Sequence, residues 1–403
     1  RRLAFTARVS VDLPAEWNQM FDDAWRTMKY RFYDPAMHGK DWDAMRAKYR
    51  PLVAHVGDRD ELLNIVNEMI GELNASHTGA APPPGGGAQS GGSVTVHLGV
   101  DLEPDAAAGR YKVTHVYKGG PADKDWVRVT VGDYLLRIDG TEVKAGDNYV
   151  KLLNQRLNRR VTVSFNRQPG LEGAWATRID PIPMNQFNQL RYERWVQQRR
   201  ELAAKLSDGR VGYLHIQAMN QPSLRKFEKE LRENRDKEAL IIDQRWNGGG
   251  NIEQELLQIL VQREYQVWQP RGTETSSRPF MGYFGPKAVL QNWRSASNAE
   301  MFPAGFKALG LGPVIGEPTM GAVIGTGSYS LIDGSTVRTP GVGVYLADEK
   351  QTNMENYGVQ PDILVVHRAE DELAGRDPQL ERAVQELLKK LGAKRITTSG
   401  QPE

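Results

Sequence analysis

The 403-residue sequence contains no cysteine. This absence excludes a disulfide framework, a thiolate metal site and a cysteine nucleophile, but it is compatible with both a reducing cytosol and a periplasm. The sequence also lacks an excess of charge of either sign, because 52 Lys and Arg residues stand against 50 Asp and Glu residues. No global basic field would therefore recruit nucleic acid, and we expect no nucleic-acid partner.

Long apolar runs are missing too. No stretch approaches the length of a membrane span, and the residues from Arg1 to Phe5 are not followed by the apolar core of a signal peptide. We therefore expect a soluble protein without a membrane partner. Because the chain does not begin with Met and apolar residues alternate from Leu3 to Val11, we expect an N-terminal strand and a fragment or processed form of a longer chain.

Helical periodicity dominates the first 81 residues. Apolar and aromatic residues from Trp17 to Met28 fall at helical spacing after Pro14, and residues 42–49 and 60–73 show the same pattern. We expect an N-terminal helical domain at residues 1–81, followed by a Pro- and Gly-rich linker at residues 82–92.

Short strand-like runs follow at residues 94–100, 111–116, 134–138 and 161–165, with an expected helix at residues 148–157. The segment Gly-Asp-Tyr-Leu-Leu-Arg-Ile-Asp-Gly at residues 132–140 resembles a PDZ domain, and His97-Leu98-Gly99-Val100 is a looser counterpart of its carboxylate-binding loop. The resemblance covers residues 93–183 and implies a small β-barrel or β-sandwich. In PDZ domains an extended peptide adds a strand to the sheet edge. A spacer domain that binds nothing is the alternative.

From residue 184 the pattern alternates between strands and helices. Strand-like runs at residues 211–216 and 239–243 are each followed by a helical pattern, which favours an α/β domain with a partly parallel sheet over residues 184–393. A tail at residues 394–403 follows it. The expected fold is thus multidomain α+β, and sites are expected at the carboxyl ends of the parallel strands.

Three consecutive glycines, Gly248, Gly249 and Gly250, follow the strand that ends at Asp243. Without a Cβ they let backbone N–H groups approach a ligand oxygen, as in a phosphate cradle or an oxyanion hole. The stretch lacks the Lys-Ser/Thr of a P-loop and the spaced glycines of a dinucleotide site, so nucleotide binding is disfavoured. No histidine pair stands at metal spacing with a carboxylate between. We therefore expect no cofactor and no metal.

Ser297 lies between an apolar run at residues 288–290 and a helical pattern that extends to Leu309. A serine in such a strand-to-helix turn lies beside free N–H groups and the positive end of a helix dipole, which favour an oxyanion and an ionising hydroxyl. The turn therefore predicts a nucleophile. The alternative is that Ser297 is only a helix N-cap, which is the commoner role of such a serine.

Four segments in the same order resemble the tail-specific and tricorn peptidases, which are serine hydrolases of one superfamily. They read Asp-Gln-Arg-Trp-Asn-Gly-Gly-Gly at residues 243–250, Ser-Ala-Ser-Asn-Ala-Glu at 295–300, Val-Ile-Gly-Glu-Pro-Thr-Met-Gly at 314–321 and Tyr-Gly-Val-Gln-Pro-Asp-Ile at 357–363. The resemblance covers essentially the whole chain and implies a crotonase-like, ββα-spiral peptidase domain after the PDZ domain. In the tricorn proteases β-propellers precede the helical domain, whereas this sequence carries no propeller repeats.

The two branches of this superfamily differ in the base that activates the serine. The tail-specific branch uses a lysine just after a Thr-aromatic-Gly turn, where this chain has Ala322. The tricorn branch instead uses a Ser-His pair from the helical domain together with a glutamate. The matching positions and their implied roles are Ser297 as nucleophile, His77 as general base and acid, Ser76 and Glu355 as the groups that orient the histidine, and Gly250 with the Asn298 N–H as oxyanion hole.

Elementary chemistry supports these roles. A neutral imidazole near its ordinary pKa takes the hydroxyl proton and returns it to the leaving amine, which contributes on the order of 10²–10⁴-fold. A carboxylate that acts on the imidazole fixes its tautomer and stabilises the imidazolium. The other six histidines are expected at surface or satisfied structural positions: His38, His55, His97, His115, His215 and His367.

The sequence thus predicts a serine endopeptidase that cleaves short or unfolded peptides through an acyl-enzyme. Two alternatives stay open, namely a PDZ-type peptide-binding scaffold on an inactive hydrolase body and a Ser-Lys tail-specific peptidase with a relocated base. The resemblance also implies a homo-oligomer, a hexamer built from trimers. We expect a cytoplasmic location, or a periplasmic or secreted one if a signal peptide precedes this fragment.

The residue after the nucleophile, Asn298, stands where the resemblance implies an aspartate that selects Lys or Arg before the scissile bond, commonly in a neighbouring subunit's pocket. An amide removes the attraction for a cation but keeps the size and the hydrogen bonding. We therefore predict a broader preference, in which uncharged or apolar residues compete with Lys and Arg. The alternative is that Asn298 is a helix cap.

Overall fold

The structure is a computed structural model that describes residues 10–83 and 94–398, in two compact units. The first unit comprises residues 1–87 and 202–403, and the second comprises residues 88–201. The strand that we expect at residues 3–11 lies almost wholly outside the described residues, as does most of the linker at residues 82–92. Within the described ranges, no helix is both long enough and apolar enough to cross a membrane.

Three helices form the N-terminal part of the first unit, as the periodicity predicts: α1 (Leu13–Arg31), α2 (Trp42–Tyr49) and α3 (Arg59–Gly71). Each begins after an aspartate, Asp12, Asp41 or Asp58, whose side chain accepts a hydrogen bond from a backbone N–H of the first turn. These caps satisfy N–H groups that no helical carbonyl reaches. The apolar faces of the helices bury one shared cluster, which includes Met20, Phe21, Met28, Leu62, Val66 and Met69.

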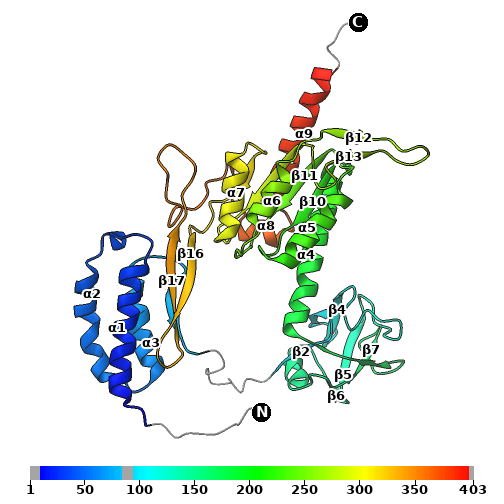
Figure 1. Cartoon of the computed structure of the whole chain (residues 1–403). Coiled ribbons are helices and arrows are strands. Elements are labelled where there is room, and N and C mark those ends of the chain that lie inside the picture. The colour runs from blue at the N-terminus through cyan, green and yellow to red at the C-terminus, as the bar shows by residue number, and fades with distance from the viewer. Residues whose placement is uncertain (1–9, 84–93, 399–403) are drawn as a thin grey trace, which may run out of the picture. The chain divides into compact units, whose positions relative to one another are not determined.

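A hairpin from far along the chain completes this helical part. β16 (Ile324–Ser330) pairs with β17 (Thr336–Gly343), and β17 also pairs antiparallel with β1 (Gly79–Ala81), directly after Ser76 and His77. Leu331 and Val337 belong to the same buried cluster as the three helices, and β17 contacts α1 (Figure 1). The expected domain of residues 1–81 therefore shares its core with the hairpin, which ties the region of His77 to the C-terminal part of the chain.

A five-stranded parallel sheet forms the core of the C-terminal α/β part of the chain, in the order β10-β11-β14-β15-β18. Its strands are β10 (Val211–His215), β11 (Ala239–Asp243), β14 (Lys287–Gln291), β15 (Val314–Gly316) and β18 (Ile363–Leu364). The first three are buried along their whole length, as parallel strands covered on both faces require. The sequence's prediction of a partly parallel α/β sheet is confirmed.

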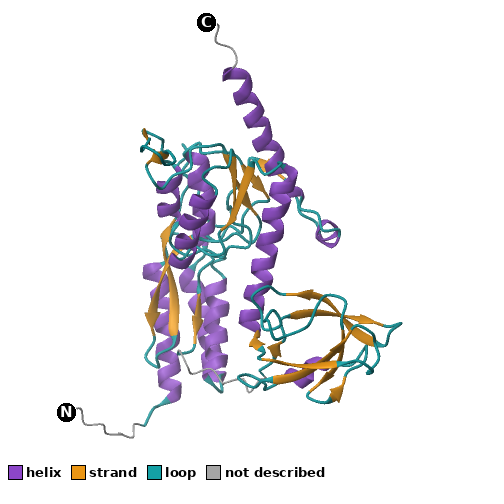
Figure 2. Cartoon of the chain, turned by 90° about the vertical axis from the view of Figure 1, so that its right-hand side faces the viewer, coloured by secondary structure: helices purple, strands orange, loops and turns teal. Residues whose placement is uncertain are grey.

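Helices cover both faces of this sheet. α5 (Gln221–Glu233), α6 (Glu253–Leu260) and α7 (Asn298–Ala308) share one apolar cluster with alternate strand residues such as Leu240, Ile242 and Val289. The strand residues that alternate with Leu240, Ile242 and Val289 point to the opposite face of the sheet. On that face α9 (Pro378–Thr398) packs against β11, β14 and β15. In Figure 2 the helix that leads to the C-terminus is α9. The shorter α8 (Ala369–Leu373) precedes it, and the hairpin of β12 (Gln266–Trp268) and β13 (Ser276–Arg278) follows α6.

The second unit is the predicted β domain followed by most of α4 (Met184–Leu206). Its antiparallel sheet runs β3 (Val100–Asp105), β4 (Arg110–Val116), β5 (Tyr134–Ile138), β7 (Val161–Asn166) and β8 (Trp175–Ile179), with β6 (Thr141–Glu142) on β5 and a separate pair of β2 (Val96–His97) and β9 (Ile182–Pro183). Fifteen buried apolar residues, among them Val100, Leu135 and Phe165, fill its core.

Two of our expectations for this unit are wrong in detail. The strand expected at residues 94–100 is divided into β2 and β3, because Gly99 adopts a φ of +76° between them. The helix expected at residues 148–157 is only a 3-10 turn at Tyr149–Leu153. Gln155 and Asn158 have φ values of 56° and 59°, and such left-handed residues end a helix.

Candidate active site

Ser297 occupies the turn between β14 and α7, as the sequence predicts. Its φ is 57° and its ψ is −127°, which is an uncommon conformation for a residue with a side chain. Its backbone N–H donates to the carbonyl oxygen of Ala322 and to Oε1 of Glu300, each at 3.0 Å. Strained backbone that is held by its surroundings is characteristic of functional sites, and here the strain presents one hydroxyl at the start of a helix.

Glu300 holds this turn, and the sequence analysis did not identify its role. The carboxylate is fully buried, and besides Ser297 N–H it accepts hydrogen bonds from Thr319 Oγ1 at 2.5 Å, Gly321 N at 2.7 Å and Ala322 N at 2.8 Å. Burial raises the pKa of Glu300, while these hydrogen bonds oppose the shift. Glu300 thus ties the nucleophile turn to the Thr319–Ala322 loop.

The glycine loop lies directly against Ser297. A Cβ at Gly249, which has a φ of +99°, would lie 2.7 Å from Ser297 Cβ, and a Cβ at Gly250 would lie 1.8 Å from the carbonyl oxygen of Met219. Only glycine fits both positions. In the described part of the chain, neither the N–H of Gly250 nor that of Asn298 donates a hydrogen bond. Two backbone donors therefore remain available beside Ser297, as an oxyanion hole requires.

The base of this loop is fixed by a buried ion-pair network. Arg245 is 2% exposed and binds Asp243 and Asp377 with two hydrogen bonds or more to each carboxylate. Asn247 Oδ1 accepts from Gly249 N at 2.9 Å, and the carbonyl oxygen of Asn247 accepts from Ala296 N at 3.0 Å. The end of β11, the glycine loop and the nucleophile turn thus form one hydrogen-bonded assembly.

Ser76, His77 and Glu355 come together although Glu355 is 279 positions from Ser76. Ser76 Oγ lies 2.9 Å from His77 Nδ1 and donates to Glu355 Oε2 at 2.9 Å, and Ser76 N donates to Glu355 Oε1 at 2.6 Å. The serine hydroxyl has a single proton, which forms the hydrogen bond to Glu355. In the hydrogen bond between Ser76 Oγ and His77, the Nδ1–H group of the histidine must therefore be the donor. His77 Nε2 is then unprotonated and available as a base.

The surroundings of His77 favour its neutral form. Burial lowers the pKa of His77, and the positive charge of Arg338 lowers it further, while Glu355 raises it. The net direction is downward, so the imidazole remains a neutral proton acceptor at pH 7.

His77 and Ser297 form no hydrogen bond with each other among the described residues. The backbone of residues 322 and 323 nevertheless links Ser297 to Glu355, the partner of Ser76. Glu355 Oε2 accepts from Val323 N at 2.8 Å, and the carbonyl oxygen of the adjacent Ala322 accepts from Ser297 N at 3.0 Å. Catalytic hydrogen bonds are often long in the absence of substrate.

Asn298 makes contacts that we did not anticipate. Its side chain is 4% exposed, and its Oδ1 accepts from Ile252 N at 2.8 Å and Glu253 N at 3.0 Å, at the start of α6. Its Nδ2 donates to the carboxylate of Glu253. The side chain thus caps a neighbouring helix of its own chain, and not the helix that it begins. Its role in substrate preference stays a prediction.

The other histidines that the structure describes lie outside the Ser76-His77-Glu355 cluster. His215 is buried, and its Nε2 donates to the carbonyl oxygen of Arg245 at 3.0 Å. Burial lowers the pKa of His215 to about 4.

The position of the tail-specific lysine is filled by Ala322. Its N–H donates to Glu300, and its carbonyl oxygen accepts from Ser297 N.

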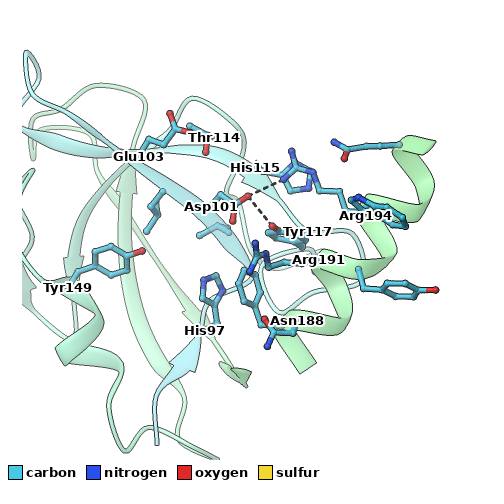
Figure 3. Close-up of a pocket in the computed structure, with 16 residues that line it drawn as sticks. His97, Asp101, Glu103, Thr114, His115, Tyr117, Tyr149, Asn188, Arg191 and Arg194 are labelled. Atoms are coloured by element: carbon cyan, nitrogen blue, oxygen red, sulfur yellow. Dashed lines mark hydrogen bonds and ion pairs between the residues drawn. The ribbon is translucent and has the colours of Figure 1, made fainter. Parts of the chain in front are cut away.

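The β domain has a cavity of its own, of about 960 Å³, between β3 and α4 (Figure 3). The ring of His97 stacks on Phe187 with centroids 3.4 Å apart, and Arg194 pairs with Asp101 at 3.0 Å. Gly99 N, in the counterpart of the carboxylate-binding loop, donates to His97 Nδ1 at 3.0 Å. This donor is therefore already used within the loop, and side chains of α4, among them Asn188, Arg191 and Arg194, line the cavity.

Sequence comparisons divide the chain into three known domain types. Residues 13–71 match the tricorn protease C1 domain, residues 97–183 match the tricorn protease PDZ domain, and residues 210–365 match peptidase family S41. Tricorn protease homolog 1 of Streptomyces coelicolor is 33% identical over 386 residues, which cover 94% of this chain and 35% of that protein.

More distant relatives show the same pattern. The tricorn protease of Thermoplasma acidophilum is 28% identical over 93% of this chain and 35% of its own length. A crystal structure of the tricorn protease superimposes with a TM-score of 0.83 at 27% identity, over 94% of this chain and 37% of that one. The chain thus spans about a third of the length of these relatives.

Proposed function

The chain belongs to peptidase family S41 and corresponds to the C1, PDZ and peptidase domains of the tricorn proteases, and on this premise we propose that it hydrolyses peptides with a Ser297-His77-Ser76-Glu355 tetrad. The substrates are short or unfolded peptides. The observation that carries the proposal is the hydrogen-bonded chain from Glu355 through Ser76 to His77, which leaves Nε2 of the histidine unprotonated.

In the first step His77 Nε2 takes the proton of the Ser297 hydroxyl as its oxygen attacks the peptide carbonyl carbon. The negative charge that develops on the carbonyl oxygen is accepted by the N–H groups of Gly250 and Asn298, reinforced by the positive end of α7. The C–N bond then breaks, and the departing nitrogen receives the proton from His77. Water, deprotonated by the same imidazole, releases the acyl group and restores Ser297.

Ser76 and Glu355 act on the imidazole. Ser76 Oγ accepts a hydrogen bond from the Nδ1–H group of His77 and thereby fixes the ring's tautomer. The carboxylate of Glu355 stabilises the imidazolium through the serine hydroxyl. Because Ser76 also binds Glu355 through its backbone N–H, the serine is held at two points. The imidazole of His77 is therefore oriented before the reaction begins, which lowers the barrier of each proton transfer.

Replacing the base tests this proposal. We expect His77→Ala to lower kcat for a short peptide by a factor of about 10² or more with a KM change below threefold. The pH profile of kcat/KM for wild type should have its acid limb below pH 6.5, because the pKa of His77 is lowered. Equal turnover of wild type and His77→Ala would exclude this histidine and favour a relocated lysine base.

A peptide-binding scaffold is the competing function. It would require the β domain to bind peptides while the tetrad does not turn over. The internal use of Gly99 N by His97 opposes a carboxylate-binding loop of the usual kind. Calorimetric titration of Ser297→Ala with peptides, beside turnover by wild type, separates binding without hydrolysis from catalysis.

We further propose that cleavage is not restricted to Lys and Arg, because Asn298 carries no negative charge. Profiling of a mixed peptide library tests this preference, and near-exclusive cleavage after basic residues would overturn it.

The proposed function also includes assembly into a homo-oligomer and a cytoplasmic location. Light scattering that shows only monomers would contradict the oligomer.

A further inference from the structure

Tyr33, His38 and Asn353 form a hydrogen-bonded chain behind the tetrad, which we name the Tyr33 clamp. His38 Nδ1 lies 2.8 Å from the carbonyl oxygen of Leu73, and His38 Nε2 lies 2.6 Å from Tyr33 Oη. Asn353 Nδ2 donates to Tyr33 Oη at 2.8 Å, and Asn353 Oδ1 accepts from Glu355 N at 3.0 Å. The chain therefore runs from Leu73, three positions before Ser76, to the backbone of Glu355.

With a neutral imidazole, the donors and acceptors of the clamp fit a single arrangement. A carbonyl oxygen only accepts, so His38 Nδ1 carries the ring proton and Nε2 is an acceptor. Tyr33 then donates its hydroxyl proton to His38 while its oxygen accepts from Asn353. Each hydrogen bond has one defined donor and one defined acceptor, which makes the chain directional. Burial and the charge of Glu355 raise the pKa of Tyr33, so its phenol keeps this proton.

The rings of the clamp are fixed by packing as well. A Cβ at Gly343 would lie 2.6 Å from Tyr33 Cδ2, so the tyrosine ring lies on a glycine of β17. His38 meets the ring of Phe32 edge-on at 5.0 Å. Met37 and His38 both have left-handed backbone, with φ values of 53° and 52°. Two consecutive strained residues persist only where the surrounding contacts hold them.

The clamp joins the two segments that carry the tetrad. Tyr33 and Asn353 are 320 positions apart, and one end of the clamp binds the backbone of Glu355 while the other binds Leu73, three positions before Ser76. A second tie runs parallel to it, because Asn356 Nδ2 donates to the carbonyl oxygen of Asn74 at 2.9 Å. A cavity of about 570 Å³, lined by the clamp residues, Asn74 and Glu355, lies on this side of the tetrad.

We propose that Tyr33, His38 and Asn353 are positioning residues that set the distance between Glu355 and the Ser76-His77 pair, and thereby the activation of Ser297. This inference rests on the proposed tetrad mechanism. None of the clamp's hydrogen bonds involves Ser297 or the imidazole of His77, so the clamp acts on kcat through Glu355 and leaves KM unchanged. Displacement of a catalytic group by about 1 Å is enough to lower a rate on the order of 10²-fold.

Tyr33→Phe tests the clamp, because it removes the hydroxyl and keeps the ring on Gly343. We expect the rate at which a fluorophosphonate modifies Ser297, and kcat for a peptide, to fall by a factor of about 10 to 100, with KM within twofold. Tyr49→Phe is the matched control, since it removes one hydroxyl hydrogen bond, to Glu72, from the same buried cluster. Its rate of modification should equal that of wild type.

The Glu355→Ala background separates positioning from general stability. Because the clamp acts through Glu355, adding Tyr33→Phe to Glu355→Ala should change kcat by less than twofold. Asn353→Ala repeats the test from the other end, should Tyr33→Phe fail to fold. Modification of Tyr33→Phe by the fluorophosphonate at the wild-type rate, or full additivity with Glu355→Ala, would overturn the clamp. Absence of Ser297 modification in wild type would instead overturn the proposed function.

Discussion

Glu300→Gln is the substitution that most directly tests how the nucleophile turn is held. Each oxygen of Glu300 accepts two hydrogen bonds, Oε1 from Ser297 N and Ala322 N, and Oε2 from Thr319 Oγ1 and Gly321 N. Glutamine has one oxygen and one NH₂ group. With its NH₂ group toward Ser297 N and Ala322 N it loses two of the four bonds, and with its NH₂ group toward Gly321 N and Thr319 it loses one, because the Thr319 hydroxyl can accept as well as donate.

The magnitude follows from these contacts. A hydrogen bond to a charged group contributes about 1.5–3 kcal/mol, so losing one or two bonds costs about 1.5–6 kcal/mol. Removal of a buried charge returns part of its desolvation cost, because burial already raises the pKa of Glu300. We therefore expect a net loss of about 3 kcal/mol in the free energy of unfolding, together with slower acylation of Ser297.

Urea unfolding followed by circular dichroism measures this loss. Glu233→Gln is the control, because Glu233 is exposed on α5 and lies 3.7 Å from Lys229, and such a surface pair contributes less than about 1 kcal/mol. If Glu300→Gln unfolds within about 1 kcal/mol of wild type and acylates at the same rate, the four bonds do not hold the turn and the reasoning is refuted.

Three further predictions concern the surroundings of the site. Asp377→Asn leaves Arg245 short of a buried partner and should cost about 3–5 kcal/mol in urea unfolding. For His215, whose pKa burial lowers to about 4, stability should be full above pH 6.5 and fall between pH 6.5 and 4, by about 3 kcal/mol relative to His215→Gln. Asn298→Asp would set a second carboxylate against Glu253, so its melting temperature should lie below wild type at pH 8 and approach it at pH 5.

Each of these has a result that contradicts it. Asp180→Asn is the control for the ion pair, since Arg160 binds Asp180 with similar two-point geometry in solvent, and an equal cost for both variants would refute the burial argument. A stability difference between wild type and His215→Gln that does not change with pH would show that His215 titrates normally in the fold. For Asn298→Asp, a melting temperature equal to wild type at pH 8 would show that the two carboxylates do not interact.

The sequence was sufficient to predict the site's local geometry where local patterns determine it. Helical spacing predicts α1 to α3, with Pro14 as a start signal for α1, and the small residues around Ser297 predict the strand-to-helix turn. The glycines of the 248–250 loop predict a close backbone approach, which Gly249 and Gly250 make. These features depend on residues that are near one another in sequence.

Contacts between distant segments could not be predicted in this way. Glu300 reads as an ordinary first-turn glutamate of α7, and its three further donors come from a loop about twenty positions later. Tyr33 and His38 give no sequence signal, because their partners Leu73 and Asn353 are defined only by the fold. The cap that Asn298 provides to α6 is equally invisible in the local sequence.

The central claim is that Ser297 is a nucleophile activated by His77. Labelling with a fluorophosphonate, read by peptide mapping and timed for wild type, Ser297→Ala and His77→Ala, tests it most directly. We predict a single modified peptide that contains Ser297, no modification in Ser297→Ala, and a labelling rate in His77→Ala lower by a factor of about 10². Modification at another serine, or an unchanged rate in His77→Ala, would contradict the claim.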